Sequence, residues 1–227
     1  MPLIALVLLV LVLVFGPGLW VRRTLKHYGA DRPDLQGTGG ELAEHLVERY
    51  GLEGVSVRQG LSGEDYYHPD EKVVSLSPEH FQGRSIAAVA VAAHEVGHAL
   101  QHQEQHPGFM LRQRRVLRAM KIERFSVLAL MVTPFLFLLI RVPQSMLLAF
   151  ILGLSGLLAT LWIQVLNLPV EFDASFNKAL PILEEGYLSS EDLPGARKVL
   201  KAAALSYVAA ALMGLLNIGR WFVILRR

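Results

Sequence analysis

Two histidines and a glutamate lie close together in the segment His94-Glu95-Val96-Gly97-His98. The surrounding residues from Ser85 to Gln103 are rich in alanine and valine, which predicts one long helix. Histidines four residues apart share one face of a helix, within reach of a single tetrahedral ion. A glutamate beside the first histidine can take a proton from a water molecule that the ion activates. The segment predicts a hydrolytic zinc site with His94 and His98 as ligands and Glu95 as general base.

A chance match on an amphipathic helix is the alternative interpretation of so short a pattern. The residues on both sides of the pattern, Val91 to Ala93 and Ala99 to Leu100, are uncharged and predict a buried helix. Burying two histidines and a glutamate costs free energy unless a partner such as a metal ion compensates for the lost hydration. We therefore favour the zinc site.

A catalytic zinc ion usually has three protein ligands and a water molecule. His102 and His106 continue the four-residue spacing, and they can be secondary ligands, part of an entrance or a polar stripe. One straight helix cannot supply all three ligands, because positions i and i+8 lie roughly 12 Å apart along its axis. A distal histidine of the metzincin type is missing as well, because Gln101 and Glu104 occupy the positions of its glycine and histidine. The third ligand must come from elsewhere, and Glu171 offers a carboxylate, unless it is only a solvated charge near a helix start.

The composition favours a membrane protein. Of the 227 residues, 52% are hydrophobic and 19% are charged, whereas soluble domains have about 45–50% apolar and about 25% charged residues. These proportions exclude a disordered chain and a coiled coil. The absence of cysteine excludes disulfides and thiolate ligands. The small net charge of +2 gives no indication of a nucleic-acid partner, and we expect none.

Four apolar runs predict transmembrane helices, since a rise of 1.5 Å per residue must cross about 30 Å of hydrocarbon. They are Pro2–Val21, Phe125–Ile140, Ser145–Leu168 and Ala202–Leu225. The second run is short and contains Pro134, so a buried core helix is its alternative. Only residues 141–144 join it to the third run, which suits a tight hairpin. The first run has no small-residue cleavage site and is followed by Arg22 and Arg23, which favours a retained anchor over a signal peptide.

Basic residues determine the expected orientation in the membrane. Three follow the first run and six lie within residues 112–124, whereas the short hairpin has one. We therefore expect residues 22–124 and 169–201 on the cytoplasmic side of a cell membrane, together with the active site. Two arginines at 226–227, at the expected outer end, argue weakly against this orientation.

The expected fold is a mainly α membrane protein with about four transmembrane helices and a small α+β cytoplasmic domain that carries the zinc helix. The expected organisation is an N-terminal anchor (1–21), a cytoplasmic metalloprotease region (22–124), a transmembrane hairpin (125–168), a cytoplasmic segment with the third zinc ligand (169–201) and a C-terminal transmembrane helix (202–227).

Short elements are expected within the region before the zinc helix. An amphipathic helix begins near Thr38, which has capping-box spacing to Glu41, and ends at Gly51. Strands are expected at Val55–Val57 and Val73–Leu76, on either side of a turn-rich stretch from Ser62 to Asp70.

The sequence resembles the YugP-like neutral zinc metallopeptidases, which are small membrane-bound bacterial proteins. The resemblance covers nearly the whole chain and is carried by Gly83–Ala88, Val91–His98, Leu168–Ser175 and Gly195–Ala204. It implies a membrane-embedded zinc peptidase of gluzincin type with Glu171 as third ligand. More distantly similar HtpX-like and CAAX-processing proteases have an aspartate four residues after the ligand glutamate, which orients a zinc histidine. Here that position is Ser175 and the nearby acid is Asp173, so the orienting residue is left open.

Three functions are compatible with these features. A zinc endopeptidase would hydrolyse membrane-associated or unfolded proteins at the cytoplasmic face. A non-proteolytic zinc-binding scaffold or assembly factor would keep its zinc and tolerate loss of Glu95. A metal transporter would need ionisable residues inside the apolar runs, and the first three runs have essentially none. We expect the endopeptidase, with Zn²⁺ as cofactor and a peptide or protein substrate and the lipid bilayer as partners.

Two further expectations concern the substrate. An oxyanion donor is expected. The candidates are Tyr66, Tyr67, His68 and Tyr187. For each of them, ordinary packing or surface exposure is the alternative interpretation. The strand Val73–Leu76 is a candidate for pairing with an extended peptide through a free edge.

Overall fold

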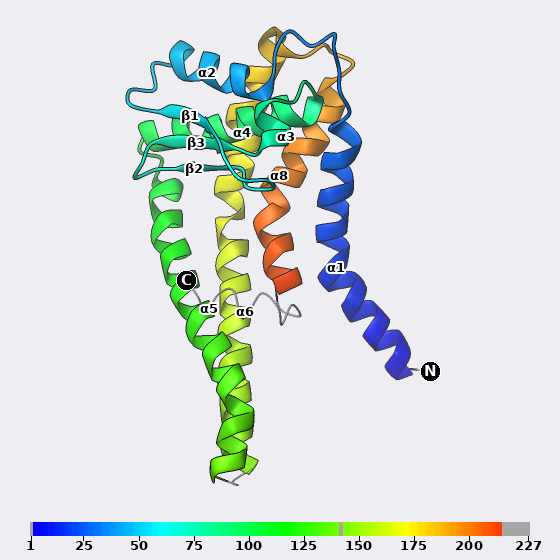
Figure 1. Cartoon of the computed structure of the whole chain (residues 1–227), viewed down its shortest axis with the longest axis vertical. Coiled ribbons are helices and arrows are strands. Elements are labelled where there is room, and N and C mark those ends of the chain that lie inside the picture. Colours follow the sequence, from blue (N-terminus) through cyan, green and yellow to red (C-terminus); the bar gives the residue numbers. More distant parts are fainter. Residues whose placement is uncertain (1, 141–142, 215–227) are drawn as a thin grey trace. The chain divides into compact units, whose positions relative to one another are not determined.

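A computed structural model of the chain describes residues 2–140 and 143–214, which are mainly helical (Figure 1). The helices are α1 (Pro2–Tyr28), α2 (Gly39–Arg49), α3 (Pro78–Phe81), α4 (Ile86–Gln103), α5 (Pro107–Ile140), α6 (Pro143–Phe172), α7 (Leu180–Ile182) and α8 (Leu193–Gly214). Two π-helical segments, η1 (Asp173–Ala179) and η2 (Leu183–Tyr187), lie on either side of α7.

The chain forms two compact units. The α+β unit consists of Leu19–Met110 and Leu168–Ser206. The helical unit consists of Met1–Gly18, Leu111–Asn167 and the described residues from Tyr207 onward. The long helices α1, α5, α6 and α8 contribute residues to both units.

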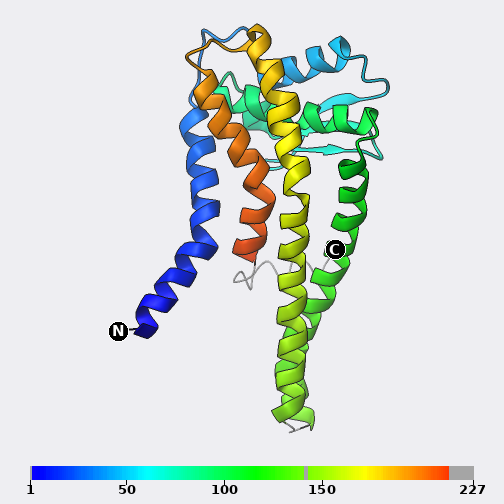
Figure 2. The ribbon, with the colours of Figure 1, turned by 180° about the vertical axis from the view of Figure 1, so that it is seen from behind.

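Two helical stretches of the described residues are long and apolar enough to cross a membrane. They are Leu8–Tyr28 and Phe150–Tyr187, and they overlap the first and third predicted runs. Figure 2 shows α6 from behind as one continuous helix, and it extends past Pro169 to Phe172. The second predicted run lies within α5, and the fourth falls partly on residues 215–225, outside the described residues.

The three-stranded sheet has the order β1-β3-β2, with β1 at Ser56–Gln59, β2 at Tyr66–His68 and β3 at Val73–Leu76. The buried central strand β3 pairs in parallel with β1 and antiparallel with β2. Since both of its edges are occupied, the expectation that Val73–Leu76 pairs with a peptide is wrong. The two predicted strands are confirmed, and β2 lies in the stretch for which only turns were expected.

Helix α2 begins as its sequence predicts. The Glu41 amide donates to Thr38 Oγ1 (3.2 Å) and the Thr38 amide donates to Glu41 Oε2 (2.7 Å), which completes the capping box. Gly51 follows the helix with a φ of +56°, a left-handed conformation that suits glycine. Leu42 and Leu46 are buried in the core that α2 shares with α4.

Helix α4 is the central element of the α+β unit. Ser85 caps its start by accepting a hydrogen bond from the Ala88 amide (3.0 Å), and every residue from Ile86 to Gln101 is buried. The segment η1 can approach α4 closely because Gly97 has no side chain. A Cβ atom at Gly97 would lie 2.8 Å from the Ala174 carbonyl oxygen in η1. Gly97 therefore sets the distance between α4 and the chain that follows Glu171.

We expect Gly97→Ala to destabilise the folded protein by about 1–3 kcal/mol, because the added methyl group overpacks the contact between α4 and η1. The measurement is thermal unfolding of the purified protein in detergent. Gly16→Ala is the matched control, since a Cβ atom there lies 3.9 Å from Val12 Cγ1, an ordinary van der Waals distance, and alanine favours a helix. A melting temperature of Gly97→Ala that equals that of Gly16→Ala would contradict the prediction.

Candidate metal centre

Three buried side chains from two helices meet beside η1. His94 and His98 come from α4 and Glu171 from the end of α6, and each is 2% exposed. One potential ligand atom of each lies within 4.8 Å of the others. Glu171 Oε2 is 3.5 Å from His94 Nε2 and 3.1 Å from His98 Nε2. The structure therefore brings together the three side chains that the sequence predicts as metal ligands.

Ser175 fixes the ring of His94. Its hydroxyl donates to the carbonyl oxygen of Leu200 in α8 (3.0 Å) and lies 3.0 Å from His94 Nδ1. Because the single hydroxyl proton goes to the carbonyl, the serine oxygen accepts from the Nδ1–H of His94. The proton of neutral His94 is therefore on Nδ1, and the lone pair of Nε2 is directed toward Glu171.

Gln101 fixes the ring of His98 in a similar way. Its amide nitrogen donates to the Val170 carbonyl oxygen (2.9 Å) and to Asp173 Oδ2 (2.7 Å). Its oxygen, 2.9 Å from His98 Nδ1, accepts the proton of that nitrogen. The Nε2 atom of neutral His98 is left with its lone pair, also directed toward Glu171.

This donor set suits a metal ion. The Glu171 oxygen and each imidazole lone pair, 3.1 and 3.5 Å apart, repel each other unless a proton or a metal cation lies between them. Nitrogen and oxygen ligands bound to zinc at 2.0–2.2 Å in tetrahedral geometry lie about 3.3 Å apart. The two oxygen–nitrogen distances are therefore close to those between zinc ligands, and the burial of all three side chains explains why the carboxylate needs a counter-charge.

The remaining predicted residues lie around this cluster. Glu95 follows His94 on α4 and is 6% exposed. His102 Nδ1 is 2.9 Å from the hydroxyl of Tyr67, and His106 Nδ1 accepts from the Phe109 amide at the start of α5 (3.3 Å). Neither of these two histidines belongs to the ligand cluster.

The four candidate oxyanion donors have other partners. Burial raises the pKa of Tyr67 to about 12, so its hydroxyl keeps its proton for His102. Tyr66 accepts from Arg58 (3.4 Å) and Tyr187 accepts from Arg49 (2.8 Å). The ring of His68 accepts from the Glu71 amide within a turn (3.2 Å).

Sequence reasoning did not identify Gln101 as part of this centre and left the role of Ser175 open. In both cases the distance along the sequence to a ligand residue gave an indication. Gln101 follows His98 by three residues, so the two side chains are neighbours on one helix face. Ser175 follows Glu171 by four residues, the position at which an orienting residue was sought in the sequence.

Comparison with known proteins agrees with this geometry. A family model described as "Putative neutral zinc metallopeptidase" matches residues 3–226. The chain belongs to this family. It is 38% identical over 211 residues to a family relative, "Putative membrane protease YugP" of Bacillus subtilis (strain 168), covering 90% of this chain and 88% of that protein. No solved structure matches the chain significantly. The resemblance stated from the sequence is thus confirmed.

We expect Glu171→Ala to remove most of the zinc bound by the purified protein, because two histidines alone leave the ion without its anionic ligand. Zinc per chain is measured after dialysis, with the melting temperature as a test of folding. Added zinc should also raise the melting temperature of the wild type. Glu104→Ala is the control, since Glu104 caps the end of α4 and pairs with Lys178. Normal zinc content in folded Glu171→Ala protein would disprove the assignment.

Proposed function

We propose that this protein is a membrane-embedded zinc endopeptidase that hydrolyses peptide or protein substrates at the cytoplasmic face of the membrane. The observation that supports the proposal is the buried convergence of His94, His98 and Glu171, with the Nδ1 atom of each histidine engaged by a separate partner. Membership in a family of metallopeptidases agrees with this activity.

The proposed reaction needs three ligands and one base. His94, His98 and Glu171 would hold the zinc ion, whose bound form would supply Lewis-acid polarisation of the scissile carbonyl group and activation of water. Glu95 accepts the proton of the attacking water and delivers it to the amine nitrogen as the C–N bond breaks. The buried apolar neighbours Val91 and Val96 limit access of water, which strengthens the electrostatic interactions of these groups.

Replacing Glu95 by glutamine should abolish hydrolysis and retain zinc, because the amide keeps the shape of the side chain and cannot accept the proton. Loss of a general base costs about 10²–10⁴-fold in rate. Cleavage of an unfolded protein is measured with wild type, Glu95→Gln and the control Glu104→Gln, with zinc quantified in each. Equal cleavage by wild type and Glu95→Gln would contradict the assigned base. Wild-type protein that holds zinc and cleaves neither unfolded nor membrane-inserted substrates would favour the scaffold.

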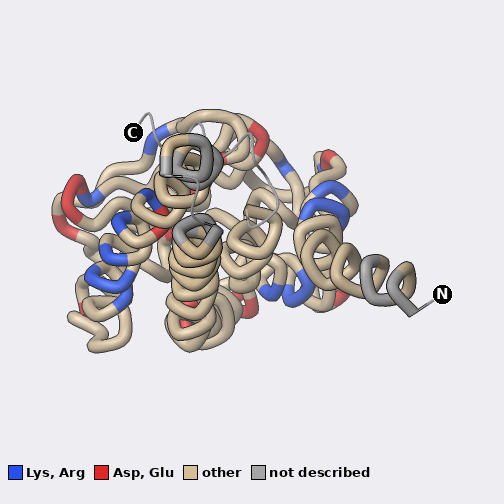
Figure 3. Tube along the Cα trace, turned by 90° about the horizontal axis from the view of Figure 1, so that it is seen from below, with Lys and Arg blue, Asp and Glu red and all other residues tan. Residues whose placement is uncertain are grey.

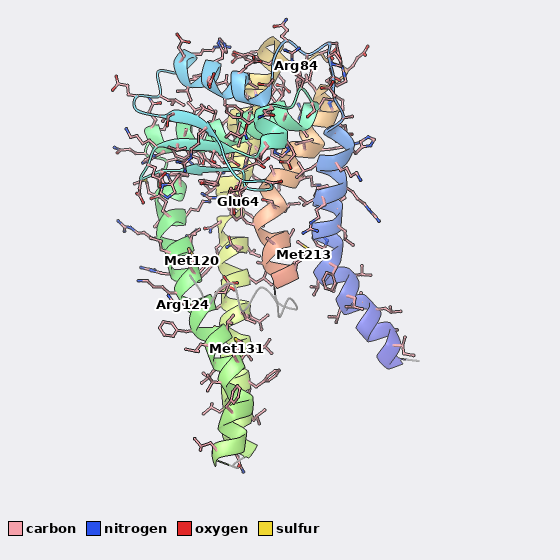
Figure 4. All side chains as sticks on the ribbon, viewed as in Figure 1. Glu64, Arg84, Met120, Arg124, Met131 and Met213 are labelled. Carbon is pink, nitrogen blue, oxygen red and sulfur yellow. The ribbon has the colours of Figure 1, made fainter. Side chains whose placement is uncertain are left out.

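The membrane placement we propose has four spans with the zinc site on the cytoplasmic side. One exposed stripe runs along α5 with alternating spacings of four and three residues, so it occupies one helix face. It consists of Arg114, Arg118, Lys121, Phe125, Leu128, Val132, Phe135 and Leu139. The stripe changes from basic to apolar after Lys121, as expected where a helix passes from lipid headgroups into hydrocarbon. Met120, Arg124 and Met131 mark this part of α5 in Figure 4.

Helix α1 has the same transition in the opposite chain direction. Large apolar side chains such as Leu8 and Leu13 are more than half exposed, and the basic residues Arg22, Arg23 and Lys26 follow them. Figure 3 shows Lys and Arg in blue on the helix that leads to the N-terminus. In both helices the basic end adjoins residues of the α+β unit in the sequence, which supports a cytoplasmic location of that unit.

Single cysteines can test this orientation without background, because the natural chain contains none. In intact cells, a membrane-impermeant thiol reagent should label Gln144→Cys in the α5–α6 hairpin and leave Ser62→Cys unlabelled until the cells are permeabilised. Both positions are exposed in the folded chain. Labelling of Ser62→Cys in intact cells would reverse the proposed orientation.

A further inference from the structure

Gln101 is a buried amide whose hydrogen bonds all lead to the candidate metal centre. Its side chain is completely buried, so each polar group left without a partner would cost free energy. The oxygen accepts from His98 Nδ1 (2.9 Å), and the nitrogen donates to Val170 and Asp173. These contacts use both of its N–H groups and one oxygen lone pair.

The surroundings permit only one orientation of the Gln101 amide. If the amide were flipped, its oxygen would face the Val170 carbonyl oxygen at 2.9 Å and Asp173 Oδ2 at 2.7 Å. Neither of these atoms can donate a hydrogen bond while Asp173 is ionised. The two acceptors therefore direct the amide oxygen toward His98 and impose the tautomer in which Nε2 is free to bind a metal ion.

Asp173 is itself held in place on its far side. Its second oxygen, Oδ1, accepts from Asn177 Nδ2 (2.8 Å) in η1, and its contact with Gln101 is a short, charge-assisted hydrogen bond. A chain of hydrogen bonds therefore runs from Asn177 through Asp173 and Gln101 to His98. His94 differs, because Ser175 connects it to a neutral carbonyl group.

We propose that Gln101 is a positioning residue of the zinc centre, which transmits the orientation and negative charge of Asp173 to the ring of His98. The arrangement is a carboxylate–histidine–metal relay with an amide inserted between carboxylate and histidine. This inference rests on the proposed zinc site, and it assigns to Asp173 an effect that acts through Gln101.

The first test is zinc affinity, measured by competition with a chelator on the full-length protein in detergent. Gln101→Met keeps the volume and removes both hydrogen-bonding functions. We expect zinc to bind about 10–100-fold more weakly, and the visible absorption bands of the cobalt-substituted protein to shift as the ligand ring reorients. The matched control is Gln103→Met, a glutamine on the same helix whose amide nitrogen donates to the Gly51 carbonyl oxygen. Melting temperatures of the zinc-free proteins report folding separately from metal binding.

The second test is a double-mutant cycle. It distinguishes an effect of Asp173 that acts through Gln101 from a direct electrostatic effect of the Asp173 carboxylate on the metal site. Asp173→Asn should weaken zinc binding by itself, and it should have no further effect in the Gln101→Met background. Additive losses would overturn the relay. Asp173 is partly exposed, so the Asp173→Asn protein tests the link even if Gln101→Met does not fold, and unchanged affinity in it would also overturn the relay.

The outcomes separate this inference from the proposed function. A wild-type protein that binds no zinc would contradict the proposed function. Wild-type zinc affinity in folded Gln101→Met protein would contradict the relay alone.

Discussion

The packing around the candidate metal centre depends on one electrostatic constraint. Two imidazole lone pairs and a carboxylate share a small buried volume. Such groups repel each other until a cation lies between them. The surrounding helices must therefore bring the three side chains together and hold them there despite this repulsion. Gly97 lets η1 approach α4, and the continuation of α6 past Pro169 brings Glu171 to the two histidines. The hydrogen bonds of Ser175 and Gln101 then keep the ring protons away from the ion site.

Local features of the fold were predictable from the sequence because they depend on neighbouring residues. The cap at Thr38, the left-handed Gly51 and the helix that carries His94 and His98 are all confirmed. Strand β2 was not predicted, since three residues are too few to show alternation, and it is defined by pairing with β3. The central position of β3 was not predictable either, because strand order is a tertiary property.

The site, too, was predictable where it depends on residues close in the sequence and unpredictable where it depends on tertiary contacts. Helical spacing places His94 beside His98, whereas Glu171 was one open possibility until the family resemblance favoured it. The partners of the histidine rings come from α4 and from η1, and their roles depend on which way an amide or hydroxyl donates. Residue spacing does not contain this information, and the π-helical segment that begins at Asp173 changes the angular positions that a regular helix would give.

The chemical nature of the donor set has one more consequence. The cluster consists of nitrogen and oxygen atoms, and the whole chain lacks cysteine. Disulfide exchange and thiol oxidation act on thiolates, so neither can remove a ligand from this centre. A centre of this kind is indifferent to the thiol redox poise of its compartment.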